Sequence, residues 1–375
     1  MGKIVYLGHY EAYEKRHTSP AGVTLMNSII GAVNEAGYDL TVISPAPLIN
    51  VEEREREEAF INKKTKCIFL PTVKLNKSLG IFGRYMCADK RSKNLDMELD
   101  LTVNDGDTLI VYHSLTLLRA VQRIKRRKNI KLIIQVCEIY ADVIGEEKIK
   151  KSELEFFTLA DSYIFSSPML EKQINTSHKP YVICLGKYST EKELTQRKND
   201  GVLHIVYAGT LDPRKGAGTA VEAAAHLSDK YHLHILGFGN KKQREDIINK
   251  IEETNRLSKA KITYDGCLKG EEYTRFIQGC HIGLSTQSPQ AEFNLTSFPS
   301  KILVYLSNGL RVISVRLPAI ELSSIGKAVY YYENSNPLCI AEAIMKVDIT
   351  DSYDGKGLLN ELHKNFIKDI KKLLN

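Results

Sequence analysis

The chain contains 375 residues with a net charge of +7; 43% are apolar and 26% charged, which excludes a disordered protein and allows two domains with separate cores. Its seven cysteines form no CxxC pair and no His/Cys ligand spacing, which argues against a disulfide framework and a structural zinc site and predicts a reduced, cytoplasmic location. No apolar run reaches the ~20 residues of a membrane span. Residues 1–7 lead directly into a predicted strand, so no cleavable signal is expected there.

The first half of the chain alternates short apolar runs with stretches of helical periodicity, a pattern typical of parallel α/β units. Residues 71–107 are less regular, and exposed-looking apolar residues are mixed with glycine at 78–86, which predicts loops there. The strands are predicted at residues 3–7, 40–44, 67–70, 108–112, 131–136, 162–165 and 181–184, and the helices at 23–36, 115–127 and 169–174.

A polar segment at 187–200 is predicted to link this half to a second α/β series, and an amphipathic helix at 358–374 closes the chain. The predicted domains are therefore 1–190 and 200–355, followed by a terminal segment at 356–375. In the second series the strands are predicted at residues 203–207, 232–236, 262–264, 282–284, 312–314 and 329–332, and the helices at 217–227, 241–252, 273–278 and 300–306.

Two segments of the second half carry the features of a phosphate site. Pro299 can open the helix at 300–306, where Ser300 and Lys301 stand at an N-terminus suited to phosphate. Upstream, Gly209 permits close backbone approach after a strand, and Arg214 and Lys215 place two cations beside the next helix start. The structural alternative for the second segment is a basic surface turn.

Polar side chains follow two neighbouring strands of the first half. His113 follows the strand at 108–112, and Glu138 follows the strand at 131–136. Ligands bind at the carboxyl ends of strands in open α/β sheets, so these side chains are candidates for positioning a hydroxyl or accepting its proton. A lone histidine is also common as a packed structural residue.

Residues 298–313 resemble the donor-site helix of retaining glycosyltransferases with the GT-B fold, as in glycosyltransferase family 4 (group 1). The segment 206–216 is similar to the "GR…KG" segment of that family, and Lys215 matches the lysine that binds the donor diphosphate there. The resemblance implies two Rossmann-like parallel-sheet domains facing a cleft. The first would bind the acceptor and the second the nucleotide sugar, and the terminal helix would cross back onto the first.

The implied activity is transfer of a sugar from a nucleoside-diphosphate sugar to a hydroxyl of a glycan or lipid-linked acceptor. Such a hexosyltransferase retains the configuration and uses no cofactor or metal, because cations and helix dipoles stabilise the departing diphosphate. The expected catalytic residues are His113, Glu138 and Lys215. The expected donor-binding residues are Gly22, Gly209, Thr210, Arg214, Lys215, Gly237, Cys267, Leu268, Thr296, Ser297, Phe298, Ser300 and Lys301.

Three of these assignments rest on weaker local patterns. Gly237 belongs to a GxG turn after a strand, which is equally typical of a simple tight turn. Cys267 and Leu268 stand in a segment that resembles the base-binding turn of the family. Gly22 follows a loop that resembles the Gly-Gly loop over the donor, although Ala21 replaces one glycine.

The sequence departs from the family pattern at the donor helix. Thr296 and Val304 stand where the family often has two glutamates, one for the sugar and one for the ribose, and Glu292 lies nearby at a different spacing. Because a valine accepts no hydrogen bond, ribose binding must differ or be weakened. A catalytically weakened partner of another glycosyltransferase, and a sugar-nucleotide epimerase, are therefore the alternative functions.

The positive charge is concentrated in one segment. Residues 61–135 hold 16 Lys or Arg residues against 6 Asp or Glu residues, a net charge of +10. Basic residues near the apolar Ile81, Phe82 and Tyr85 predict peripheral contact with an anionic membrane at its cytoplasmic face. The alternative, equally open for the basic run at 123–128, is a solvated helix face. Nucleic acid is not an expected partner, because no binding motif or interleaved aromatic residues accompany the charge.

Overall fold

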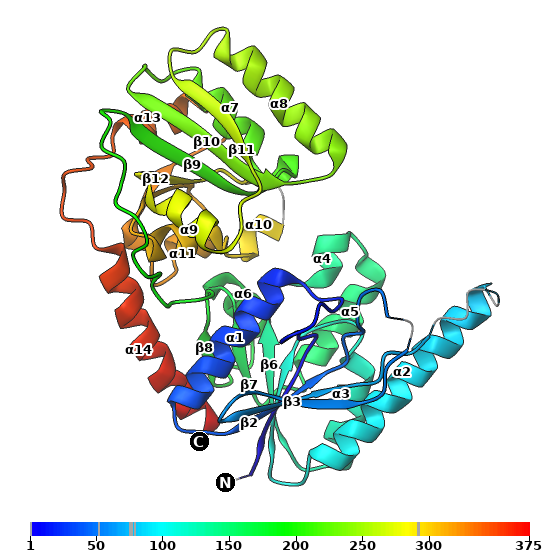
Figure 1. The fold of residues 1–375 in the computed structure, drawn as a ribbon. Coiled ribbons are helices and arrows are strands. Elements are labelled where there is room, and N and C mark those ends of the chain that lie inside the picture. The colour runs from blue at the N-terminus through cyan, green and yellow to red at the C-terminus, as the bar shows by residue number, and fades with distance from the viewer. Residues whose placement is uncertain (1, 52, 75–77, 79, 291–292) are drawn as a thin grey trace. The chain divides into compact units, whose positions relative to one another are not determined.

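The computed structural model describes residues 2–51, 53–74, 78, 80–290 and 293–375. The chain divides into two compact units, Met1–Lys187 together with Asn365–Asn375, and Tyr188–Lys364 (Figure 1). Residues 189–200 form no helix or strand and belong to the second unit.

The first unit is built on a mainly parallel sheet in the strand order β3-β4-β2-β1-β5-β6-β7-β8, in which β3 alone among the described strands runs antiparallel to its neighbour, β4. The parallel stretch forms because crossover helices follow β1, β4, β5, β6 and β7, whereas β2 leads to β4 through the strand β3. Its strands are β1 (Ile4–Leu7), β2 (Leu40–Ser44), β3 (Glu57–Asn62), β4 (Thr65–Phe69), β5 (Thr108–Tyr112), β6 (Lys131–Val136), β7 (Ser162–Phe165) and β8 (Tyr181–Ile183).

Helices cover both faces of this sheet. The face bearing Val5 and Leu7 packs against α2, α3 and α5 in one apolar core, whereas the Gly8 side meets Met26 of α1. Ser19 caps α1 by accepting the N–H of Gly22, with Pro20 in the first turn. The helices of this unit are α1 (Pro20–Glu35), α2 (Gly80–Thr102), α3 (Leu118–Arg127), α4 (Tyr140–Ile144), α5 (Glu147–Phe157) and α6 (Pro168–Ile174).

The prediction of loops at 71–107 is wrong, because most of this segment forms the helix α2. Its apolar stripe is narrow: Cys87, Leu95 and Leu99 are buried, while Ile81 and Phe82 are exposed and break the helical periodicity. The strand β3 was not predicted, because its alternate residues are exposed and the exposed Phe60 interrupts the usual apolar pattern.

The second unit contains a parallel sheet in the strand order β11-β10-β9-β12-β13-β14. Its strands are β9 (Leu203–Thr210), β10 (Tyr231–Phe238), β11 (Lys261–Gly266), β12 (Ile282–Ser285), β13 (Arg311–Val315) and β14 (Val329–Tyr332). Its helical elements are η2 (Pro213–Lys215), α7 (Ala217–Ala224), α8 (Lys241–Asn255), α9 (Gly270–Gln278), α10 (Phe293–Thr296), α11 (Lys301–Ser307), α12 (Pro318–Glu321), η3 (Gly326–Ala328) and α13 (Pro337–Met345).

The last helix, α14 (Gly355–Leu374), ends the chain, and its residues from Asn365 onward group with the first unit. Phe366, Ile370 and Leu373 are buried there, and the hydroxyl of Tyr38 donates to Oδ1 of Asn375 at 2.9 Å. None of the described helices is long and apolar enough to cross a membrane.

Candidate functional site

In the second unit, the predicted donor residues gather at the carboxyl ends of β9, β10 and β11. Gly209 and Thr210 end β9, and Gly237 stands beside Gly209 in the register of β10. A Cβ atom at Gly237 would lie 2.3 Å from the carbonyl oxygen of Gly209, so only glycine allows the strands this close at their ends. Such strand ends are where open α/β sheets bind ligands.

Lys301, the first residue of α11, brings a buried cation to this place. Its Nζ lies 3.8 Å from the centre of the Tyr207 ring and 3.1 Å from the position of a Cβ at Gly209. The side chain as a whole is partly exposed, but Nζ has no accessible surface and no hydrogen-bond partner among the described residues. Burial, with a smaller effect of Lys215, lowers the pKa of Lys301 to about 7.

The cations of the 206–216 segment are held by the backbone geometry around η2. Arg214 is mostly exposed and is paired with the Asp212 carboxylate at 2.7 Å. The Tyr207 hydroxyl donates toward the carbonyl oxygens of Thr210 and Lys215, at 2.9 and 3.0 Å, which fixes the turn. Gly216 ends η2 with φ +84°, a left-handed conformation that favours glycine. Lys215 and Lys301 thus act on the same region, whereas Arg214 is held by Asp212.

The hydroxyl of Tyr305 locks α11 to the sheet. It accepts the N–H of Ala208 in β9 at 2.9 Å and donates to the carbonyl oxygen of Leu284 in β12 at 3.1 Å. Its ring fills the space over Gly283, where a Cβ atom would come within 2.3 Å. Helical periodicity identifies Tyr305 only as an apolar residue of the helix, because a hydroxyl that bonds two strands gives no periodic signal.

A cavity of about 470 Å³ adjoins Gly237 and lies wholly within the second unit. The exposed ring of Phe238 and the partly exposed ring of Tyr264 line it, and the Tyr264 hydroxyl donates to the carbonyl oxygen of Gly237 at 3.0 Å. Cys267 also lines it, in the turn after Gly266 (φ +81°), while Leu268 does not. Two aromatic faces beside lysine and arginine side chains suit a flat, anionic ligand such as a nucleotide.

The remaining donor candidates precede α11. Thr296 ends α10, and Ser297 and Phe298 follow it, all partly exposed, while Ser300 is exposed and makes no side-chain cap for α11. Val304 lies one turn after Lys301 in α11. Glu292 lies outside the described residues.

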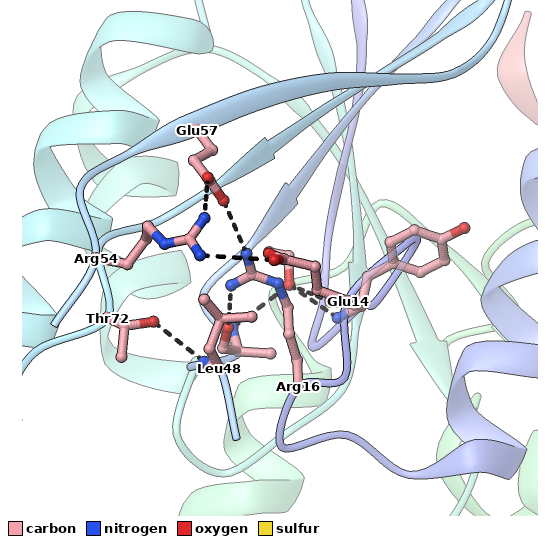
Figure 2. A network of polar contacts seen from close by, with 9 residues as sticks. Glu14, Arg16, Leu48, Arg54, Glu57 and Thr72 are labelled. Carbon is pink, nitrogen blue, oxygen red and sulfur yellow. Dashed lines mark hydrogen bonds and ion pairs between the residues drawn. The ribbon is translucent and has the colours of Figure 1, made fainter. Parts of the chain in front are cut away.

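In the first unit, the loop between β1 and α1 is fixed by a polar network around the buried Arg16 (Figure 2). The buried Arg16 donates to the carbonyl oxygen of Ala46 at 2.9 Å and pairs with Glu57 at 3.4 Å. Arg54 joins Glu57 to Glu14, at 2.5 and 3.6 Å. Gly22 follows this loop in α1, where a Cβ atom would lie 3.0 Å from the Tyr112 hydroxyl, so its small size brings α1 close to the end of β5.

The two catalytic candidates of the first unit lie in different environments. His113 is only 1% exposed, packed against the rings of Tyr140, Phe156 and Phe157, and burial lowers its pKa to about 3. Its Nε2 is 3.3 Å from the buried Glu153 carboxylate, which accepts the N–H groups of Tyr140 and Ala141 at the start of α4.

The packing around His113 matches the structural reading of a lone histidine, whereas Glu138 is partly exposed. The catalytic roles of both residues stay predictions. Of the two, the geometry favours Glu138 as the group that can reach a ligand.

Comparisons with solved structures identify the architecture. The α,α-trehalose 6-phosphate synthase from Burkholderia multivorans superposes with a TM-score of 0.70 at 10% identity, covering 100% of this chain and 95% of that one. A trehalose-6-phosphate protein from E. coli bound with UDP-2-fluoro glucose gives 0.69 at 10% identity over 99% and 98% of the chains. The chain has the GT-B fold. A trehalose-6-phosphate synthase studied for glycosyl transfer with retention gives 0.64 at 10% identity, covering 99% and 98%.

At this identity the likeness establishes the GT-B fold, with its two Rossmann-like sheets and C-terminal helix. No protein-family model and no curated protein matches the sequence. The assignment to family 4 and the roles of the donor helix therefore stay predictions.

A cluster that the sequence analysis did not expect lies elsewhere on the GT-B scaffold. His204, His232 and His234 each offer a ring nitrogen within 4.8 Å of the others. No metal site was expected from the sequence, because the spacing of these histidines along the chain was not recognised as a ligand pattern. The available signal was the His-Leu-His spacing in β10, because residues two apart in a strand share one face.

The buried Lys301 has a consequence for stability. In the unfolded chain its pKa returns to the ordinary ~10.4, so between pH ~7 and ~10 the unfolded state binds more protons. The contribution of Lys301 to the free energy of unfolding therefore rises with pH between pH ~7 and ~10. Lys301→Met is expected to raise the melting temperature at pH 6 and to lose this advantage toward pH 10, as thermal unfolding at several pH values can show.

The exposed Lys346, replaced in the same way, serves as the control and is expected to show no such pH dependence. A Lys301→Met protein that is less stable than the wild type at pH 6, or equally stabilised at pH 6 and 10, would contradict a buried ammonium.

Proposed function

We propose that this GT-B protein transfers a sugar from a nucleoside-diphosphate sugar to a hydroxyl of a glycan or lipid-linked acceptor, with retention and without a catalytic metal. The observation that carries the proposal is the buried ammonium of Lys301, which has no counter-ion among the described residues and stands with Lys215 at the end of β9. A cation kept in this state costs stability, and a bound diphosphate supplies the missing charge.

Different residues of the second unit bind different parts of the donor. The cavity beside Phe238, Tyr264 and Cys267 takes the nucleobase, and Gly209 and Gly237 let the diphosphate approach the backbone. Lys301 and Lys215 stabilise the negative charge that develops on the leaving diphosphate, which lowers the barrier to sugar transfer. Glu138, after β6 of the first unit, is the proposed group that orients the acceptor hydroxyl.

A ligand-binding experiment tests the donor assignment directly. UDP, GDP and ADP and their sugar conjugates are screened by thermal shift, because a ligand at 100 times its Kd adds about 2.7 kcal/mol of stability. One base series is expected to stabilise the wild type and the Lys346→Ala control, and to stabilise Lys301→Met much less. Equal stabilisation of Lys301→Met, or no response to any nucleotide, would overturn the proposal.

A second candidate is a donor-binding partner that does not catalyse transfer. Val304 and Thr296 in place of the two expected glutamates favour it, and so does the burial of His113. The two functions differ in one measurement. A catalyst releases free nucleoside diphosphate from its stabilising donor when acceptor, or water, is present, whereas a partner subunit binds the donor and releases none.

The acceptor side of the proposal involves the start of α2. Ile81, Phe82 and Tyr85 are 80%, 67% and 75% exposed on the described part of this helix, close to the exposed Arg84 and Arg91. Figure 1 shows α2 as a long helix at the edge of the first unit. Exposed apolar and basic side chains together are typical of a segment that inserts at an anionic membrane surface.

Co-sedimentation with vesicles checks this membrane contact. Binding to vesicles containing phosphatidylserine is expected at low salt and should fall as salt rises, since each basic group near the surface contributes about 1 kcal/mol. Ile81→Ser with Phe82→Ser should lower binding strongly, and Phe60→Ser, an exposed aromatic on β3, serves as the control. Equal binding to neutral vesicles would point to a soluble acceptor instead.

A further inference from the structure

Three histidines lie together on one face of the second sheet. His232 is paired with His204 in the parallel register of β10 and β9, and His234 is two residues further along β10. Because alternate residues of a strand share a face, the three imidazoles project to the same side. His204 and His234 are buried and His232 is partly exposed, so the group is close to the surface.

Two of these rings each bond a carboxylate through one nitrogen, and their other nitrogens, called the inner nitrogens, face each other with a lone pair each. Nε2 of His204 lies 3.1 Å from the Asp200 carboxylate, and Nδ1 of His234 lies 3.1 Å from that of Asp265. A carboxylate accepts, so each outer nitrogen carries the hydrogen and each inner nitrogen of a neutral ring has a lone pair. These inner nitrogens, Nδ1 of His204 and Nε2 of His234, face each other at 2.8 Å. Two lone pairs at that distance repel unless a proton or a metal ion lies between them.

In the third ring, that of His232, the outer nitrogen likewise carries the hydrogen and the other nitrogen has a lone pair. The hydroxyl of Thr263 donates to Asp265 at 2.8 Å and therefore accepts from Nε2 of His232 at 3.1 Å. Neutral imidazoles whose outer N–H groups are held by oxygen are the form in which histidine binds metal.

We propose that His204, His232 and His234 bind a divalent transition cation of the zinc type, with Asp200 and Asp265 orienting two of the rings. Imidazole ligands favour Zn²⁺, Co²⁺ or Ni²⁺ over Mg²⁺ or Ca²⁺, which prefer oxygen. With Zn–N bonds of 2.0–2.1 Å in tetrahedral geometry, two ligand nitrogens are roughly 3.4 Å apart. The inner pair at 2.8 Å must open by only about half an ångström to admit the ion.

The position of this site separates it from the proposed donor chemistry. His204 is the second residue of β9 and Gly209 is five residues later, a distance of roughly 17 Å along an extended strand. The ion therefore has a structural role: it joins β9 to β10 and, through Asp265, to the end of β11 just before the Gly266 turn. The inference does not depend on the proposed function.

Metal content of the untagged full chain tests the proposal. The protein is stripped with a chelator, given equimolar Zn²⁺, passed through gel filtration and assayed for bound zinc and melting temperature. The wild type is expected to retain one zinc ion and to melt at a higher temperature than the stripped form. His226→Gln, which changes an exposed histidine outside the cluster, is the matched control and should behave like the wild type.

Two variants decide the assignment of ligands. His232→Gln changes the partly exposed ligand, so the fold should persist by circular dichroism while zinc retention is lost. Asp265→Asn should weaken zinc binding roughly 10- to 100-fold, the usual effect of losing a carboxylate behind a ligating histidine. A wild type that retains no zinc, or a His232→Gln protein that retains as much as the control, would show a hydrogen-bonded histidine network without metal and would overturn the proposal.

Discussion

Replacing Lys215 with alanine is expected to lower kcat by roughly 30- to 1000-fold while leaving the fold intact, equivalent to ~2–4 kcal/mol of barrier. The side chain belongs to η2. Its positive charge acts on the buried amine of Lys301 and, after burial itself, is the second cause that lowers the pKa of that group. Its interaction with the diphosphate strengthens as the leaving group gains charge, so kcat should fall more than donor affinity.

Steady-state kinetics of Lys215→Ala are compared with those of Lys346→Ala, an exposed lysine just after α13. Circular dichroism and melting temperature establish that both variants are folded. Turnover of Lys215→Ala within a factor of two of the wild type would exclude the proposed role. If the two cations act on one phosphate group, the double variant with Lys301→Met should lose less than the sum of the single losses.

Gly216→Ala is expected to destabilise the second unit by about 2–4 kcal/mol, from overpacking together with left-handed backbone strain. A Cβ at this position would lie 1.6 Å from the carbonyl oxygen of Thr286, and the residue has φ +84°. The Thr286 hydroxyl also donates to the carbonyl oxygen of Gly216 at 2.7 Å, so the two segments cannot separate without breaking a buried hydrogen bond.

Gly218→Ala, two residues further along and inside α7, provides a matched control. A Cβ there meets only the flexible side chain of Lys250 at 3.6 Å, and alanine favours a helix over glycine, so stability should rise by about 0.5–1 kcal/mol. Urea unfolding measures both changes. A Gly216→Ala protein as stable as Gly218→Ala would mean that the turn before α7 does not have this geometry.

The sequence was most informative where periodicity and burial coincide. The strands at 40–44, 108–112, 131–136, 162–165 and 329–332 have the predicted bounds, because strands that lie largely buried in a parallel sheet form nearly continuous apolar runs. The helix α2 was missed because its buried face is narrow and its first turns expose Ile81 and Phe82. Apolar residues that face outward do not follow the spacing of the buried stripe, so they obscure the helical periodicity of the segment.

The candidate site was predictable only in part. Gly209, Lys215 and Lys301 could be proposed from motifs, since a glycine and cations that closely follow a buried strand are typical of a phosphate-binding edge. The burial of the Lys301 ammonium could not be predicted, because it depends on Tyr207 from another element, the strand β9. The same holds for the histidine cluster. His204 in β9 lies 28 and 30 residues before His232 and His234 in β10, and the three become neighbours only through the register of the two strands.

The hydroxyl of Tyr305 accepts a backbone N–H of β9 that would otherwise bond the neighbouring strand β12. β9 and β12 pair at Ile205 and Val206, and two residues later the amide of Ala208 donates to Tyr305. The exchange of that amide hydrogen with deuterium therefore reports how often α11 leaves the sheet, one residue before Gly209. A slow rate that becomes slower with nucleotide would mean that ligand binding and the seating of α11 are one cooperative event.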